Sequence, residues 1–260
     1  MVRRVDSAHD GEVEVIVVIK AAPEIGQRHG ESVCVAGIDD YGRWHRLYPL
    51  PFRDLEPDQK FRRWDRIRVR WRRAADDSRI ESKRIDSAAL RVVGQVPKSE
   101  RHVVASHAIV GSLETEWESG RSLALIRPEN VKFMVRSLSD NELSKSRRRR
   151  AELLDQGDLL ASSIISKEPC PFAFYYEFDH ALRRRTHICI DWETENTYFK
   201  WRSKYGEAEA LRHMKNRWGI ELPASGLAFA FGTHRVKMFR KWLLSGVIQI
   251  PLDDQASLLL

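Results

Sequence analysis

Residues 61–73 (FRRWDRIRVRWRR) carry the pattern that most constrains how this chain folds. From position 65 onward, arginines alternate with mostly apolar residues. The two faces are Arg66, Arg68, Arg70 and Arg72 on one side, and Asp65, Ile67, Val69 and Trp71 on the other. A period of two is typical of a β-strand with one face in a core. The sequence therefore predicts a half-buried strand whose exposed face is lined by arginines.

The exposed arginines have two interpretations. Successive residues on one face of a strand lie about 6.6 Å apart, which is close to the phosphate spacing along one nucleic-acid strand. An arginine ladder can therefore follow a sugar–phosphate backbone. In the alternative interpretation, the arginines pair with acids on neighbouring strands of a solvated sheet face. Four guanidinium groups on one face need either carboxylates or an anionic ligand, so the pattern suggests nucleic acid without indicating a reaction.

Composition predicts a folded protein whose basicity is local. The chain has 260 residues, 42% of them hydrophobic, and a net charge of only +7, so no polybasic tail explains the charge. Cys34, Cys170 and Cys189 lack the spacing of a metal site and are expected to be reduced thiols. No stretch has the roughly 18 apolar residues of a membrane span, and the N-terminus lacks a secretory signal. We expect a cytoplasmic protein without membrane contact.

The order of the expected elements predicts an α+β fold with two domains. Residues 1–137 are expected to form a β-rich, barrel-like domain, because several short apolar runs are separated by turn signals. Its strands are expected at 12–20, 32–38, 43–47, 60–73, 79–85, 90–96, 123–126 and 131–137, with a helix at 99–117. Residues 138–165, which contain four consecutive arginines, are expected to be a charged helical connector. Residues 166–260 are expected to form a smaller α+β domain.

The second half contains a candidate catalytic group. His187 and Asp191 lie at opposite ends of an expected strand, Glu193 follows its tip, and His234 lies in a later turn. A metal site of His187, Asp191 and Glu193 would hold Mg²⁺ or Mn²⁺ and activate water for phosphodiester hydrolysis. Lys200 would then neutralise developing phosphate charge.

The same residues also have a structural interpretation. Asp191 is well placed to cap the following helix, and Glu193 would favour that helix's first turn. His187 and His234 would then make ordinary strand and turn contacts. The sequence leaves open whether the protein is an enzyme.

Two further groups of residues are candidates for contact with nucleic acid. Trp44, Arg46 and Tyr48 share one strand face and precede Arg53. Aromatic rings beside guanidinium groups suit stacking on unpaired bases, although a small barrel also needs such aromatic rings in its core. The other group is a predicted basic rim in the C-terminal half, formed by Arg183, Arg184, Arg185 and Arg235.

Three segments resemble those of a family of uncharacterised bacterial and archaeal proteins. They are residues 42–53 (GRWHRLYPLPFR), residues 191–193 (DWE) and residues 232–234 (GTH). The resemblance extends over most of the chain and implies no particular activity. The leading hypothesis from the residues is a nucleic-acid-binding protein that contacts phosphates through the arginine strand, in genome defence or a mobile element. The alternatives are a metal-dependent nuclease that uses Asp191 and Glu193, and a protein-interaction subunit.

Overall fold

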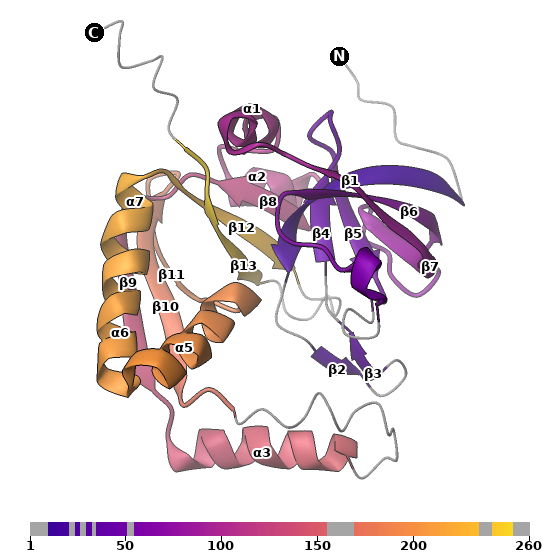
Figure 1. Cartoon of the computed structure of the whole chain (residues 1–260). Coiled ribbons are helices and arrows are strands. Elements are labelled where there is room, and N and C mark those ends of the chain that lie inside the picture. The colour runs from indigo at the N-terminus through magenta and orange to yellow at the C-terminus, as the bar shows by residue number, and fades with distance from the viewer. Residues whose placement is uncertain are drawn as a thin grey trace, which may run out of the picture.

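A computed structural model of the chain describes residues 10–20, 24–26, 30–32, 35–50, 55–154, 169–233 and 241–251. The fold is mixed α+β, as the sequence predicts. Its N-terminal part is a closed five-stranded barrel, and two three-stranded sheets with helices follow it (Figure 1). No helix in these described ranges is long and apolar enough to cross a membrane.

The barrel has the strand order β1-β4-β5-β7-β6 and closes by pairing β6 with β1. The strands are β1 (Asp10–Lys20), β4 (Val35–Ile38), β5 (Trp44–Tyr48), β6 (Asp65–Arg73) and β7 (Ser82–Gln95). A two-stranded hairpin of β2 (Glu24–Gly26) and β3 (Gly30–Ser32) separates β1 from β4, and η1 (Pro57–Gln59) separates β5 from β6. All neighbours are antiparallel except β5 and β7. This order with one parallel pair is the topology of oligonucleotide-binding (OB) barrels.

Alternating side chains fill the barrel interior. Ile67 and Val69 of β6 are fully buried, together with Val15, Val17 and Leu47 from the neighbouring strands. The strand predicted at 60–73 is thus confirmed over residues 65–73, and β4 and β5 form an antiparallel hairpin around residues 40–42. The sequence predicted two strands at 79–85 and 90–96, but the chain forms the single long strand β7.

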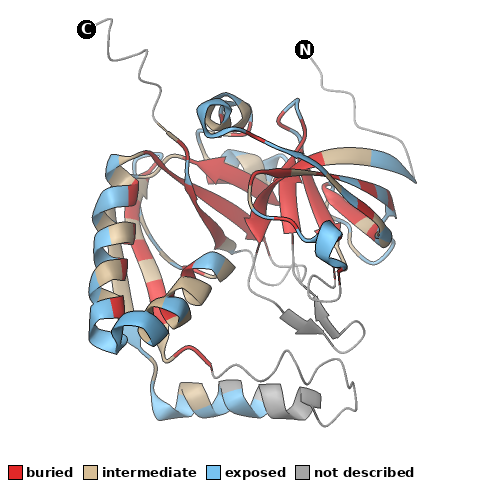
Figure 2. Cartoon of the chain, viewed as in Figure 1, coloured by how far each residue is buried: buried red, intermediate tan, exposed pale blue. Residues whose placement is uncertain are grey.

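The outer face of β1, β4 and β5 is buried as well. It packs against the sheet of β8 (Leu123–Ile126), β12 (Leu227–Thr233) and β13 (Trp242–Gln249). Ile38 and Trp44 meet Leu125 and Ala230 in this second apolar layer. Figure 2 shows the resulting band of buried strands running from the barrel into that sheet. The surface of the barrel that remains open to solvent is therefore the opposite side, formed by β6 and β7.

The third layer lies beyond the β8-β12-β13 sheet. It consists of a sheet in the order β11 (Arg183–Ile188), β10 (Phe172–His180) and β9 (Glu129–Ser137). The helices α5 (Trp192–Tyr205) and α6 (Glu207–Asn216) pack with it, followed by η3 (Arg217–Glu221) and α7 (Leu222–Ala224). Aromatic side chains fill this core, and Tyr176 contacts Phe229 with ring centroids 4.7 Å apart. Gly206, with a φ of 82°, separates α5 from α6.

Three segments differ from the expected elements or extend them. The expected helix at 99–117 is instead η2 (Lys98–Glu100) followed by two short helices, α1 (Arg101–Ser106) and α2 (Leu113–Glu118). The expected connector contains α3 (Asp140–Leu154), and residues 155–168 lie outside the described part. The strands β8 and β9, expected at the end of the first domain, pair instead with β12 and β10 of the C-terminal half. A strand's partner depends on the whole chain, so local pattern cannot supply it.

Candidate nucleic-acid interface

The four arginines of β6 form a ladder on the outside of the barrel. Arg66, Arg68, Arg70 and Arg72 point outward because the residues between them fill the interior. Arg68 and Arg70 are 52% and 65% exposed. The structure therefore brings together the four arginines on one accessible face.

Acidic side chains lie along one side of this ladder. Glu14 of β1 accepts two hydrogen bonds from Arg68, at 3.0 and 2.6 Å. Asp40 in the β4–β5 turn accepts two from Arg66, at 2.8 and 2.7 Å, and this bonding raises the pKa of the Arg66 guanidinium. Glu12 lies 4.0 Å from Arg70. The alternative interpretation, pairing with acids on a neighbouring strand, thus describes this side of the ladder.

The other side of the ladder is different, because two of the four arginines face arginines there, while Arg70 faces Asp86. Arg68 lies directly opposite Arg91 of β7, and Arg72 lies directly opposite Arg84. The guanidinium of Arg91 donates to the backbone carbonyls of Ala88 and Leu90, and Arg84 lies 4.0 Å from Asp76. Like charges directly opposite on adjacent strands destabilise a sheet. This arrangement of Arg68, Arg91, Arg72 and Arg84, here called the arginine face, is one that a bound anion would stabilise.

Sequence reasoning missed Arg84 and Arg91. Both lie in segments that were correctly expected to be strands, but the sequence gives no signal for the register that sets them opposite β6. A bulge in β7 between the partners of Arg68 and Arg70 shifts that register further.

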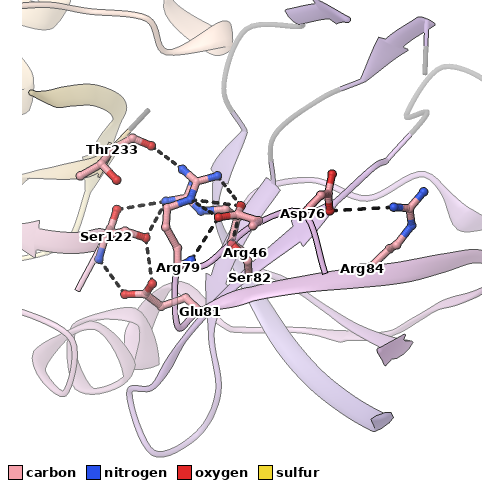
Figure 3. A network of polar contacts seen from close by, with 9 residues as sticks. Arg46, Asp76, Arg79, Glu81, Ser82, Arg84, Ser122 and Thr233 are labelled. Atoms are coloured by element: carbon pink, nitrogen blue, oxygen red, sulfur yellow. Dashed lines mark hydrogen bonds and ion pairs between the residues drawn. The ribbon is translucent and has the colours of Figure 1, made fainter. Parts of the chain in front are cut away.

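Arg46, a predicted nucleic-acid contact, is buried instead. It is 6% exposed, and its Nη2 donates to the carbonyl oxygen of Ser122 at 3.0 Å and to the hydroxyl at 3.1 Å. The Ser122 hydroxyl in turn donates to Glu81 at 2.8 Å. Arg79 extends the network by donating to the carbonyl of Thr233 at 2.6 Å (Figure 3). This polar network joins the barrel to β8 and β12, so Arg46 does not lie on a surface that a phosphate can reach.

The other predicted contacts lie apart from the arginine face. Arg183, Arg184 and Arg185 are on β11, in a different sheet from β6. Arg184 pairs with Glu177 at 2.8 Å and with Asp179 at 3.0 Å. Arg185 donates to Glu114 at 2.7 Å, and that bond lowers the pKa of the Glu114 carboxyl to about 2. Arg53 and Arg235 lie outside the described residues.

Asp191 is buried against an arginine. Its Oδ1 accepts a hydrogen bond from Arg63 Nη2 at 2.8 Å, and its Oδ2 accepts one from the Thr194 hydroxyl at 3.2 Å. Burial raises the pKa of Asp191, and the guanidinium of Arg63 opposes that rise. Asp191 occupies the N-cap position of α5, but its side chain makes no capping hydrogen bond there. Its carboxylate instead connects the beginning of α5 to the barrel, because Arg63 comes from the segment before β6.

Of the other candidate catalytic residues that the structure describes, Glu193 shares Arg63 with Asp191. Glu193 is 48% exposed and lies 3.5 Å from Arg63. His187 stacks on the ring of Phe178 and meets the ring of Phe231 edge-on, and burial lowers its pKa. Within the described ranges, no three His, Cys, Asp or Glu side chains cluster as metal ligands do. Lys200 is exposed on α5, and His234 lies outside the described part.

Comparisons with known proteins give a family but no activity. A model named domain of unknown function DUF8758 matches residues 11–110, and one named domain of unknown function DUF8757 matches residues 105–260. The two matched ranges overlap at residues 105–110, after the barrel and before β8. No curated protein matches the chain.

Among solved structures, the chain is similar to one in a replication protein A heterotrimer bound to single-stranded DNA. The identity is 12% and the TM-score 0.36, over 97% of this chain and 51% of that one. This chain therefore spans about half the length of that structure's chain. By the match over residues 105–260, the protein belongs to the family defined by the domain of unknown function DUF8757.

Proposed function

We propose that this protein binds nucleic acid through the sugar–phosphate backbone, on the arginine face of β6 and β7. The observation that carries the proposal is the cross-strand register, which sets Arg68 opposite Arg91 and Arg72 opposite Arg84. Exposed guanidinium groups in such rows bind phosphates bidentately. A phosphate between two opposed guanidinium groups would replace their repulsion with attraction.

Two features favour backbone contact over reading of bases. OB barrels bind oligonucleotides on the face of their second and third strands, and here the corresponding strands β4 and β5 are covered by the β8-β12-β13 sheet. The strongly exposed aromatic residues in the described part, Tyr41 and Tyr205, lie outside β6 and β7. We therefore expect binding that depends steeply on salt and little on sequence.

The test is a titration of labelled single- and double-stranded DNA and RNA at two salt concentrations. We expect the double variant Arg68→Gln/Arg91→Gln to bind about tenfold more weakly, with the salt slope reduced by roughly one to two. The matched control is Arg212→Gln, because Arg212 is similarly exposed and ion-paired but lies on α6. Equal affinity for the double variant and the control would overturn the proposal, and so would an absence of binding to all four nucleic acids.

The same titration with Mg²⁺ or Mn²⁺ tests the nuclease hypothesis. Asp191 is unsuitable for this purpose, because its replacement breaks the buried bond to Arg63. Glu193→Gln removes an exposed carboxylate and leaves that bond in place. Metal-dependent cleavage that disappears in Glu193→Gln would establish the nuclease function. Binding without cleavage, with or without metal, agrees with the binding function proposed above.

A further inference from the structure

One end of the arginine face opens into a depression at the mouth of the barrel. The depression has a volume of ≈ 680 Å³ and lies between the first residues of β1, the end of β6 and the beginning of β7. Ligand pockets in proteins have volumes of roughly 300–1,000 Å³. The space is therefore large enough for a nucleotide, whereas the rest of the arginine face is a strand surface.

Gly11 and Trp71 both line the depression. Gly11 pairs directly with Trp71, and a Cβ atom placed on Gly11 would meet Trp71 Nε1 at 3.8 Å. The φ angle of Gly11 is +153°, which favours glycine over other residues. Within the part of the chain that the structure describes, this indole N–H makes no hydrogen bond to another residue. Trp71 is 8% exposed and Lys83 Nζ lies 3.1 Å from the centroid of its ring, so only a small part of the indole meets the space.

The walls carry groups of both charges. Arg70, Arg72 and Arg84 line the depression, and so do the carboxylates of Asp10, Glu12 and Asp86. Arg72 and Arg84 are opposite each other, so a phosphate between them would contact two guanidinium groups. Carboxylates bind the hydroxyl groups of ribose. The mixture fits a phosphorylated sugar better than a simple anion.

The depression lies at the end of the arginine ladder, where β6 ends. Arg72 and Arg70 line it, and Arg68 and Arg66 continue away from it along β6 in steps of about 6.6 Å. A strand that follows the ladder from Arg66 therefore reaches the depression at Arg72. Beyond Arg72, β6 ends at Arg73.

We propose that this depression receives the terminal nucleotide of a bound strand, with the terminal phosphate between Arg72 and Arg84. This proposal rests on the function proposed above, because the strand is brought there by the arginine face. The protein would then prefer nucleic acid with a phosphorylated end.

The experiment compares one oligonucleotide in three forms: with a 5′ phosphate, with a 3′ phosphate, and with neither. We expect the wild-type protein to bind one phosphorylated form about tenfold more tightly than the unphosphorylated form, which is the effect of an added charge-assisted bond. Arg84→Gln should remove that preference and still bind. Arg91→Gln, on the same strand but away from the depression, should weaken all three forms equally and keep the preference.

Two outcomes separate this inference from the proposed function. Binding of all three forms with equal affinity overturns the terminal-nucleotide site and leaves the arginine face intact as a binding surface. No binding of any form overturns both. As a second readout, a nucleoside monophosphate should shift the one indole N–H resonance that is absent in Trp71→Phe. If inorganic phosphate produces the same shift at the same concentration, the depression is a phosphate site only and the inference for a nucleotide is wrong.

Discussion

Arg63 and Arg68 belong to the same arginine-rich stretch but have opposite environments. Arg63 is 9% exposed, and its Nη1 donates to the carbonyl of Val247 at 2.6 Å while its Nη2 binds Asp191. Arg68 is 52% exposed and pairs with Glu14 at the surface. A buried guanidinium cannot exchange its partner for water, whereas an exposed one can. Arg63 therefore holds two parts of the fold together, and Arg68 is available to a ligand.

The largest expected effect is the loss of stability when the buried arginine, Arg63, is replaced. Arg63→Met leaves the Asp191 carboxylate buried without its cation, so the free energy of unfolding should fall by about 3–5 kcal/mol. Denaturant titration measures the change. The control is Arg62→Met at the exposed neighbouring position, which should cost within about 0.5 kcal/mol. Similar losses for the two variants would show that Arg63 is not the structural arginine.

A second buried arginine should give a smaller effect. Arg46→Met removes the donor to Ser122 and leaves that carbonyl and hydroxyl short of one hydrogen bond each. We expect a loss of about 1–3 kcal/mol in the free energy of unfolding. Affinity for nucleic acid, measured where the variant is fully folded, should not change. If the folded variant instead binds nucleic acid more weakly than the wild type, Arg46 contributes to binding and this prediction is wrong.

Lys20 is a buried cation near Arg63 whose contribution to stability should depend on pH. It is 7% exposed, and burial lowers its pKa to about 8. Between pH 8 and the unfolded value of 10.5, the unfolded chain binds more protons than the folded one, so this residue's contribution to stability rises with pH. The wild type should therefore gain on the order of 1–3 kcal/mol relative to Lys20→Met across that window. Denaturant titrations at several pH values measure the difference, and a constant difference would contradict the lowered pKa.

The smallest effect on stability is expected at the exposed arginine. Arg68→Gln should change the free energy of unfolding by no more than about 0.5 kcal/mol, because a surface ion pair contributes little. Its removal also relieves the repulsion from Arg91. Oligonucleotide affinity should nevertheless fall. A variant that loses stability but keeps its affinity would reverse the assignment of roles to Arg63 and Arg68.

Local patterns predicted much of this fold. The alternation in β6, the hairpin at residues 40–42 and the helix break at Gly206 are all readable from nearby residues. The arginine ladder was predictable for the same reason, since a period of two assigns each side chain to a face. The partners of those arginines were not, because Glu14 and Arg91 reach them only through the register of other strands.

The other candidate residues show where local pattern fails. Arg46 shares a strand face with Trp44 and Tyr48 and was expected to be accessible there, but the β8-β12-β13 sheet covers that face. Asp191 was expected either to cap α5 or to bind a metal, and its side chain instead binds an arginine more than a hundred positions earlier in the chain.

By itself, the sequence determined which residues share a face of each strand, because backbone geometry fixes that alternation within a few residues. Only the tertiary structure decided which faces meet solvent. That choice depends on how a distant sheet buries apolar area against β4 and β5, and on the register that sets Arg68 opposite Arg91 and Arg72 opposite Arg84. The same arginine-rich stretch thus supplies both a buried attachment at Arg63 and an exposed row along β6.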